Sequence, residues 1–130
     1  MAVGRLEPQP HRFTVDQYHQ MGTAGIFGEE ARVELIEGEV VEMVPIGSDH
    51  ASVVDRLTQL LATQVEGRAI VRVQNPVRLN DLSEPQPDVS LLKFRPDYYR
   101  EAHPGPQDTI LMVEVADTSS AFDRNRKLPL

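Results

Sequence analysis

The stretch that most constrains the fold of this chain is segment 84–92, which reads Glu-Pro-Gln-Pro-Asp-Val-Ser-Leu-Leu. Pro87 lacks an amide hydrogen, so it suits the first position of a strand and fits poorly inside one. The apolar run that follows therefore predicts a strand over residues 88–94. Asp88 stands at the start of that strand, where a carboxylate can face a cleft.

A second carboxylate lies within another apolar stretch. Residues 109–116 read Thr-Ile-Leu-Met-Val-Glu-Val-Ala, a pattern typical of a central strand that is covered on both faces. Strand alternation places Glu114 on the face of Met112 and Ala116. An ionised carboxylate among such neighbours would be paired, protonated or bound to a cation, unless it lies near the strand end and reaches solvent. The sequence alone leaves both interpretations of Glu114 open.

The rest of the chain alternates irregularly between helical and strand patterns. A Thr-Val-Asp-Gln capping box predicts a helix over residues 15–21. Apolar side chains recur every three or four positions over residues 48–66 and predict the longest helix. A Glu-Gly pair at 37–38 separates two β-branched runs and predicts a hairpin. Shorter patterns predict strands over 69–73 and 77–79, a helix over 96–100, and a last helix that starts at Thr118 or Ser119 and runs towards Leu128.

These elements predict an α/β fold of the mixed α+β type, with a central mixed sheet flanked by helices. The length of 130 residues suits one domain, which we expect over residues 12–130 after a flexible arm at 1–11. The absence of cysteine excludes disulfides and zinc–thiolate sites. The first residues lack the apolar core of a signal peptide, and no run approaches membrane-spanning length. A cytoplasmic location is therefore the default expectation.

The formal net charge of −7 argues against broad, non-specific binding of nucleic acid by electrostatics alone. It does not exclude a nuclease, because acids gathered at a metal site count as negative until the metal binds. If the strands that carry Asp88 and Glu114 are neighbours, two hard oxygen ligands converge, as a Mg²⁺ site with retained waters needs. Such a site can activate a water for phosphoryl displacement. Without that partner, Asp88 has a simpler interpretation as a solvated turn aspartate.

The order of certain residues resembles a known nuclease family. Pro87-Asp88, then Glu114-Val115-Ala116, then Lys127 resembles the PD-(D/E)XK nuclease superfamily, in a variant whose lysine has moved from the strand to the following helix. Over roughly residues 12–130 the chain resembles the Uma family of putative restriction endonucleases. Each short motif is weak alone, but their order and spacing are specific. The motifs are Val33-Glu-Leu-Ile-Glu-Gly-Glu-Val-Val41, His50, Pro76-Val-Arg-Leu79, Glu84-Pro-Gln-Pro-Asp-Val89, His103-Pro-Gly-Pro-Gln-Asp108 and Leu111-Met-Val-Glu-Val115.

The resemblance implies a restriction endonuclease-like fold and a DNA endonuclease that hydrolyses phosphodiester bonds by a metal-activated water. Asp88 and Glu114 would be the ligands of Mg²⁺ or Mn²⁺, joined by the Val115 carbonyl. Lys127 would orient the attacking water or stabilise developing charge. The plainer interpretation of Lys127 is an ion pair with Asp123 on an exposed helix face.

Two further residues match positions of the family. Glu34 would be an auxiliary acid that extends the metal site through a water, and its alternative is a solvent-facing strand glutamate. His50 stands near the start of the long helix and would be an auxiliary residue of the site. Helix capping or loop packing is the alternative for His50.

The sequence departs from the family pattern after Lys127. Family members complete the helix and add further strands, whereas this sequence ends at Leu130. We therefore expect the C-terminal part of the family fold to be missing, and a homodimer or larger homo-oligomer to cover an exposed strand edge. The alternative function is a non-catalytic oligomeric module on a degenerate nuclease scaffold. A two-carboxylate hydrolase for another substrate ranks last, because 5% aromatic residues and no tryptophan offer no platform for a sugar.

Overall fold

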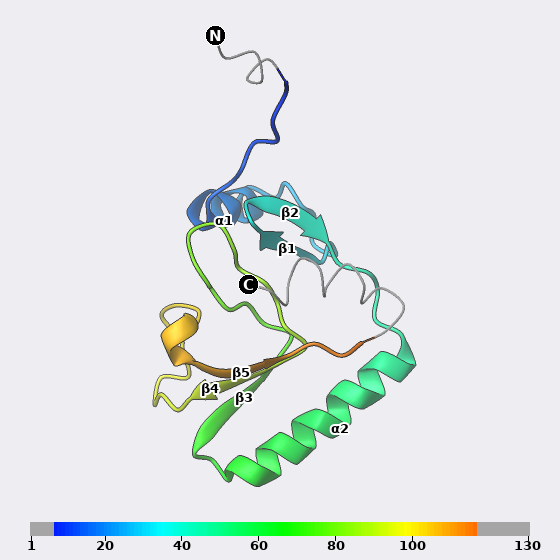
Figure 1. Ribbon diagram of the computed structural model, residues 1–130, viewed down its shortest axis with the longest axis vertical. Coiled ribbons are helices and arrows are strands. Elements are labelled where there is room, and N and C mark those ends of the chain that lie inside the picture. Colours follow the sequence, from blue (N-terminus) through cyan, green and yellow to red (C-terminus); the bar gives the residue numbers. More distant parts are fainter. Residues whose placement is uncertain (1–6, 117–130) are drawn as a thin grey trace.

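The computed structural model describes residues 7–116, which form two helices, a short 3-10 helix and five strands. The strands form two antiparallel sheets, one of order β1-β2 and one of order β3-β4-β5. Figure 1 shows α1 beside the β1–β2 hairpin, and α2 along the three-stranded sheet. The mixed α/β class is confirmed, and the arrangement is consistent with a restriction endonuclease-like fold. In chain order the elements are α1 (Val15–Thr23), β1 (Val33–Ile36), β2 (Glu39–Glu42), α2 (Ser48–Val65), β3 (Ala69–Val73), β4 (Val89–Lys93), η2 (Pro106–Asp108) and β5 (Thr109–Val113).

The predicted capping box at the start of α1 is confirmed. The Gln17 amide donates to the Thr14 hydroxyl at 3.2 Å, and the Thr14 amide donates to the Gln17 side chain at 2.9 Å. These two bonds satisfy amides that a helix start leaves without intrahelical partners. Val15 and Tyr18 on the inner face of α1 then pack on the hairpin. They form a buried cluster with Val33 and Leu35, against which Phe13, Phe27 and Val40 also pack.

The predicted hairpin is also confirmed, and its turn explains its sequence. Glu37 and Gly38 have φ values of 51° and 82°, as a two-residue turn between right-twisted strands requires. A Cβ atom on Gly38 would lie 2.6 Å from the Cβ of Arg12, so only glycine fits this close approach. The hairpin is thereby fixed against the segment that enters α1.

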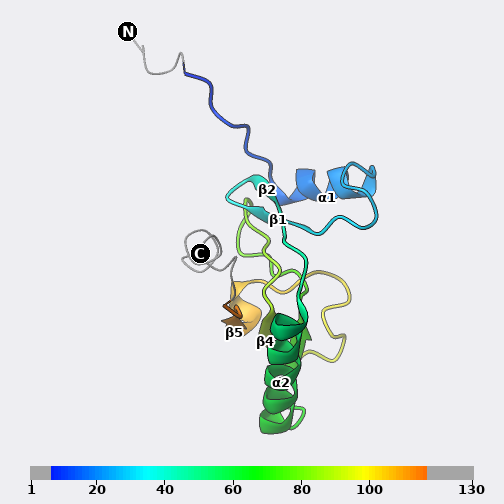
Figure 2. The same cartoon turned by 90° about the vertical axis from the view of Figure 1, so that its right-hand side faces the viewer.

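The long helix was predicted within one residue of its observed bounds. Residues Glu66 and Gly67, with φ values of 48° and 77°, end α2 and turn the chain into β3. The helix packs on β3 and β4, and Val54 is its buried residue. Figure 2 shows α2 lying along one side of the three-stranded sheet.

Two predicted elements, the strand over 77–79 and the helix over 96–100, do not form. Residues 77–79 are not a strand of either sheet, although the amides of Val77 and Leu79 each donate over 3.0 Å to the carbonyls of Pro85 and Ser83. Prolines at 76, 85 and 87 cannot donate to a ladder, so pairing here stays irregular. Residues 96–100 form a turn rather than a helix, because the backbone reverses through left-handed conformations.

The prediction of a central strand over 109–116 is wrong for the part of the chain that the structure describes. The central strand of the sheet is β4, while β5 pairs with β4 alone within residues 7–116 and ends at Val113. Ile110 and Leu111 are exposed. An apolar pattern indicates that a strand is hydrophobic, but it does not determine which strands lie on either side of it in the sheet. The predicted last helix, Lys127 and residues 1–6 of the predicted arm lie outside the described residues.

Candidate active site

Asp88 is a buried carboxylate at the start of β4, directly after Pro87 as the sequence predicts. Its Oδ1 lies 3.0 Å from Nε2 of His50, in the first turn of α2. Its Oδ2 accepts the Val115 amide hydrogen at 2.7 Å. Both side chains of the Asp88–His50 pair are largely shielded from solvent. The carboxylate therefore ties the start of α2 to the chain that leaves β5.

The segments that carry Asp88 and Glu114 adjoin neighbouring strands of one sheet. Strands β4 and β5 are antiparallel neighbours, with Val89 paired to Val113. Continuing this register by one residue sets Asp88 across from Glu114. Side chains directly opposite each other on antiparallel strands lie on the same face. The two strands are therefore neighbours, which is the condition for the two acids to share a site, and Glu114 directly follows the end of β5.

Glu34 lies on β1 and is only 2% exposed, so its interpretation as a solvent-facing glutamate is wrong. Its Oε1 accepts the amide hydrogen of Gln86 at 2.9 Å. The Gln86 side chain in turn donates to the Val33 carbonyl at 3.2 Å. These contacts hold β1 against the segment that leads into Asp88. Glu34 therefore contacts that segment at Gln86, two residues before Asp88.

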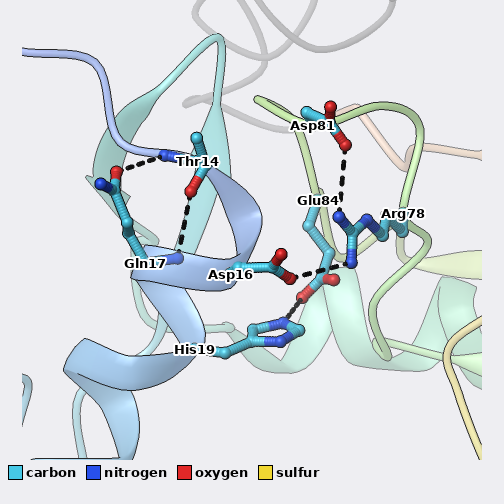
Figure 3. A network of polar contacts seen from close by, with 7 residues as sticks. All are labelled: Thr14, Asp16, Gln17, His19, Arg78, Asp81 and Glu84. Carbon is cyan, nitrogen blue, oxygen red and sulfur yellow. Dashed lines mark hydrogen bonds and ion pairs between the residues drawn. The ribbon is translucent and has the colours of Figure 1, made fainter.

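A second carboxylate–histidine pair lies on the same segment and was missed from the sequence. Oε1 of the buried Glu84 lies 2.8 Å from Nε2 of His19 on α1, as Figure 3 shows. Alternation along an extended chain places Glu84, Gln86 and Asp88 on one face. Pro85 and Pro87, on the other face, are fully buried. The alternation of polar residues and prolines over residues 84–88 is the sequence pattern that could have indicated that Glu84 shares a face with Asp88.

Arg78 connects α1 to the same region. Figure 3 shows its guanidinium between the carboxylates of Asp16 and Asp81. The guanidinium nitrogens lie 3.3 Å from Asp16 Oδ1, on α1, and 3.3 Å from Asp81 Oδ1, in the loop before β4. Both carboxylates are well exposed, so each pair contributes little alone. Together with the His19–Glu84 pair they position α1 over the 78–84 segment.

Burial and the nearby charges shift the pKa values of Tyr18 and His103. Burial, followed by the charges of Glu84 and Glu34, raises the pKa of Tyr18 to about 12. Desolvation lowers the pKa of His103. The charge of Glu84 opposes this shift, and the charges of Arg72 and His19 reinforce it. The ring centroids of His103 and His19 are 6.2 Å apart.

The donor set suits a hard divalent cation. Two carboxylates and a backbone carbonyl are oxygen ligands of the kind that Mg²⁺ takes with several retained waters. Each carboxylate oxygen has two lone pairs, so Asp88 keeps acceptor capacity beyond its bonds to His50 and Val115. Within residues 7–116 there is no group of three or more His, Cys, Asp or Glu side chains arranged to hold a metal ion. The fit therefore rests on the pair of acids and on carbonyl and water oxygens.

Comparison with known proteins identifies the family. The model of the Uma2 family, described as "Putative restriction endonuclease", matches residues 15–130. A search of curated proteins finds no relative that matches the chain. None of the helices between residues 7 and 116 is long and apolar enough to cross a membrane. The resemblance drawn from the sequence motifs is confirmed: the chain belongs to the Uma2 family of restriction endonuclease-like proteins.

Proposed function

We propose that this protein is a metal-dependent DNA endonuclease that hydrolyses phosphodiester bonds, with Asp88 and Glu114 at its centre. Membership of the Uma2 family supports the nuclease class. The observation that carries the assignment of the site is the 2.7 Å bond from the Val115 amide to Asp88 Oδ2. This bond fixes one acid against the stretch of chain that carries the other.

The carboxylates of Asp88 and Glu114 and the carbonyl of Val115 are the proposed ligands of Mg²⁺ or Mn²⁺. A cation bound there supplies Lewis acidity towards a phosphate oxygen and lowers the pKa of a coordinated water. Glu34 is the proposed auxiliary acid, acting through a water. Lys127 is the proposed group that orients the attacking water; it lies outside the described residues.

His50 has a positioning role in this proposal. Its Nε2 lies 3.0 Å from Asp88 Oδ1, so it holds the carboxylate in one orientation while Oδ2 is held by the Val115 amide. Substitution of a residue that orients a metal ligand typically lowers metal affinity or activity by about 10- to 100-fold. His50 therefore contributes by fixing Asp88 before a cation binds.

Plasmid cleavage in the presence of Mg²⁺ tests the proposal. Asp88→Asn and Glu114→Gln should lower the cleavage rate by at least about 100-fold, more than the loss of an outer residue. Both substitutions keep side-chain size and remove charge. Asp55→Asn, an exposed carboxylate of α2, is the matched control and should cleave as the wild type does.

A wild-type protein that cleaves no DNA with Mg²⁺ or Mn²⁺, and whose melting temperature does not rise with either metal, would overturn this function. The non-catalytic module is then the remaining alternative. For that module Asp88→Asn and Glu114→Gln leave stability unchanged or raise it, because repulsion between close carboxylates is relieved without loss of a cation. The expected homodimer remains a prediction, for which the exposed β5 residues Ile110 and Leu111 offer an apolar contact.

A further inference from the structure

The turn that follows β4 has an unusual composition for this chain. Residues 93–100 read Lys-Phe-Arg-Pro-Asp-Tyr-Tyr-Arg. The chain has four phenylalanines and three tyrosines, and three of these seven rings lie in this turn. The same eight residues carry three cations and one carboxylate, although the whole chain has a net charge of −7. Aromatic rings and positive charge are therefore concentrated in the segment that ends β4 and follows it. Figure 1 shows where this strand lies in the three-stranded sheet.

The backbone of the turn is strained at its two tyrosines. Tyr98 and Tyr99 have φ values of 53° and 58°, a conformation that bulky residues rarely adopt. Three hydrogen bonds hold it: Tyr98 N to Arg95 O at 3.0 Å, Arg100 N to Asp97 O at 3.1 Å, and Tyr99 N to Asp97 Oδ1 at 3.3 Å. The fold therefore maintains a conformation that the residue types disfavour.

The strained turn sends its two tyrosine rings to different environments. Tyr99 is buried, its hydroxyl donates to the Lys93 carbonyl, and the Arg95 guanidinium lies 5.1 Å from its ring centroid. Tyr98 is 64% exposed and meets the 47% exposed Phe94 edge to face, with 5.8 Å between centroids. Tyr99 thus anchors the turn, and Tyr98 and Phe94 form an exposed aromatic pair on a fixed base. Packing explains Tyr99 but not the exposure of the other two rings.

We propose that the exposed pair of Tyr98 and Phe94 stacks on unpaired bases of a nucleic-acid substrate, while Lys93 and Arg100 contact its phosphates. This inference rests on the proposed nuclease function and narrows its substrate class to nucleic acid with a single-stranded segment. Aromatic stacking tolerates any base, and cations beside the rings follow the backbone. The local positive charge favours a polyanion over an apolar protein surface, although the rest of the chain is acidic.

The position of the turn fits one continuous substrate. Asp88 precedes β4 and Phe94 follows it, so about six extended residues, or roughly 20 Å, separate the two sites along the sheet. At about 3.4 Å per nucleotide along a stacked strand, that distance spans roughly six nucleotides. A strand cleaved near Asp88 can therefore reach the turn.

Binding of a fluorescent single-stranded DNA 20-mer, followed by anisotropy in EDTA so that no cleavage occurs, tests the inference. Tyr98→Ala should weaken binding at least about fivefold, which is about 1 kcal/mol. Tyr98→Gly should weaken it equally, because glycine keeps the left-handed backbone and removes only the ring. Tyr98→Leu should not restore binding, since it is apolar but cannot stack. Leu60→Ala, which changes another exposed apolar residue, on α2, is the control that should bind as the wild type does.

The phosphate contacts have a separate signature. With single-stranded DNA, Lys93→Gln and Arg100→Gln should each reduce the slope of log affinity against log salt concentration by about 0.7. Blunt duplex DNA should lose less affinity than the single strand when Tyr98 is replaced. Equal losses on both would show that unpaired bases are not what the ring recognises, and would overturn the inference.

The outcomes separate this inference from the proposed function. Wild-type-like binding by Tyr98→Ala and Tyr98→Gly, or no binding of single-stranded DNA by the wild type, overturns the stacking site. If the wild type binds single-stranded DNA through Tyr98 but cleaves no DNA with Mg²⁺ or Mn²⁺, the nuclease function is overturned instead. A change of oligomeric state in Tyr98→Ala by light scattering, with unchanged DNA affinity, assigns the rings to contact between copies of the chain and also overturns the inference.

Discussion

Replacing Tyr18 with phenylalanine gives a prediction whose size follows from the structure. The Tyr18 side chain is buried between α1 and the hairpin, and its hydroxyl donates to the Val33 carbonyl at 3.2 Å. Burial and then the charges of Glu84 and Glu34 raise its pKa to about 12. The ordinary value is about 10. The shift of the Tyr18 pKa therefore reports first the burial of the phenol and then the two acids near it.

The sign follows from the raised pKa. Folding favours the protonated phenol, so its contribution to stability is complete below about pH 10 and is lost as the pH rises through about 12. Between about pH 8 and about pH 11 the wild type should lose roughly 1.4 kcal/mol that the phenylalanine variant does not lose. Near pH 8 the variant should be less stable by only about 0.5–1 kcal/mol, because the Val33 carbonyl also accepts from the Gln86 side chain. The order of stability of the two proteins should therefore reverse at high pH.

Urea denaturation of both proteins at the two pH values measures this reversal. Glu84→Gln should reduce the alkaline loss of the wild type, since it removes the charge that raises the Tyr18 pKa more of the two. The exposed Glu29→Gln is the charge-matched control and should change nothing. A stability difference between wild type and Tyr18→Phe that is the same at both pH values would refute the reasoning.

Two further predictions concern the core and acidification. Leu35→Ala removes a fully buried side chain of the hairpin cluster and should cost about 2–5 kcal/mol in urea denaturation, whereas the exposed Leu60→Ala should stay within about 0.5 kcal/mol of wild type. Similar costs for both would contradict the assigned core. Desolvation lowers the pKa of His103, so the unfolded chain binds the proton first as the pH falls through about 6.5. Thermal melting should therefore show that wild type loses more stability than His103→Gln on acidification; equal losses would contradict this.

The sequence predicted elements whose determinants lie within a few residues of each other. The capping box of α1 needs only Thr14 and Gln17, and the hairpin turn needs only Glu37 and Gly38. The start of β4 after Pro87 is equally local, because a missing amide hydrogen acts at its own position. These patterns correctly located Asp88.

The errors arose where distant residues decide the local conformation. Tyr98 and Tyr99 adopt left-handed φ because Tyr99 is buried and bonds to the end of β4, which no propensity contains. A central strand and an outer strand can both have the apolar pattern of residues 109–116, so this pattern could not predict the position of β5 in the sheet. The solvent-facing alternative for Glu34 failed for the same reason. Its burial depends on Gln86, 52 residues later in the chain.

The histidine partners show why a site is harder to predict than its acids. Asp88 and Glu84 lie on one extended segment, and alternation alone puts them on the same face. Their partners come from different helices, His50 from α2 and His19 from α1. Which residue of a helix meets a given carboxylate depends on how the helix packs, so no spacing within the sequence encodes it. Because both helices are tied to this segment, Asp88 is oriented by the assembled fold, and substitutions at its supports should change the site without touching the acid itself.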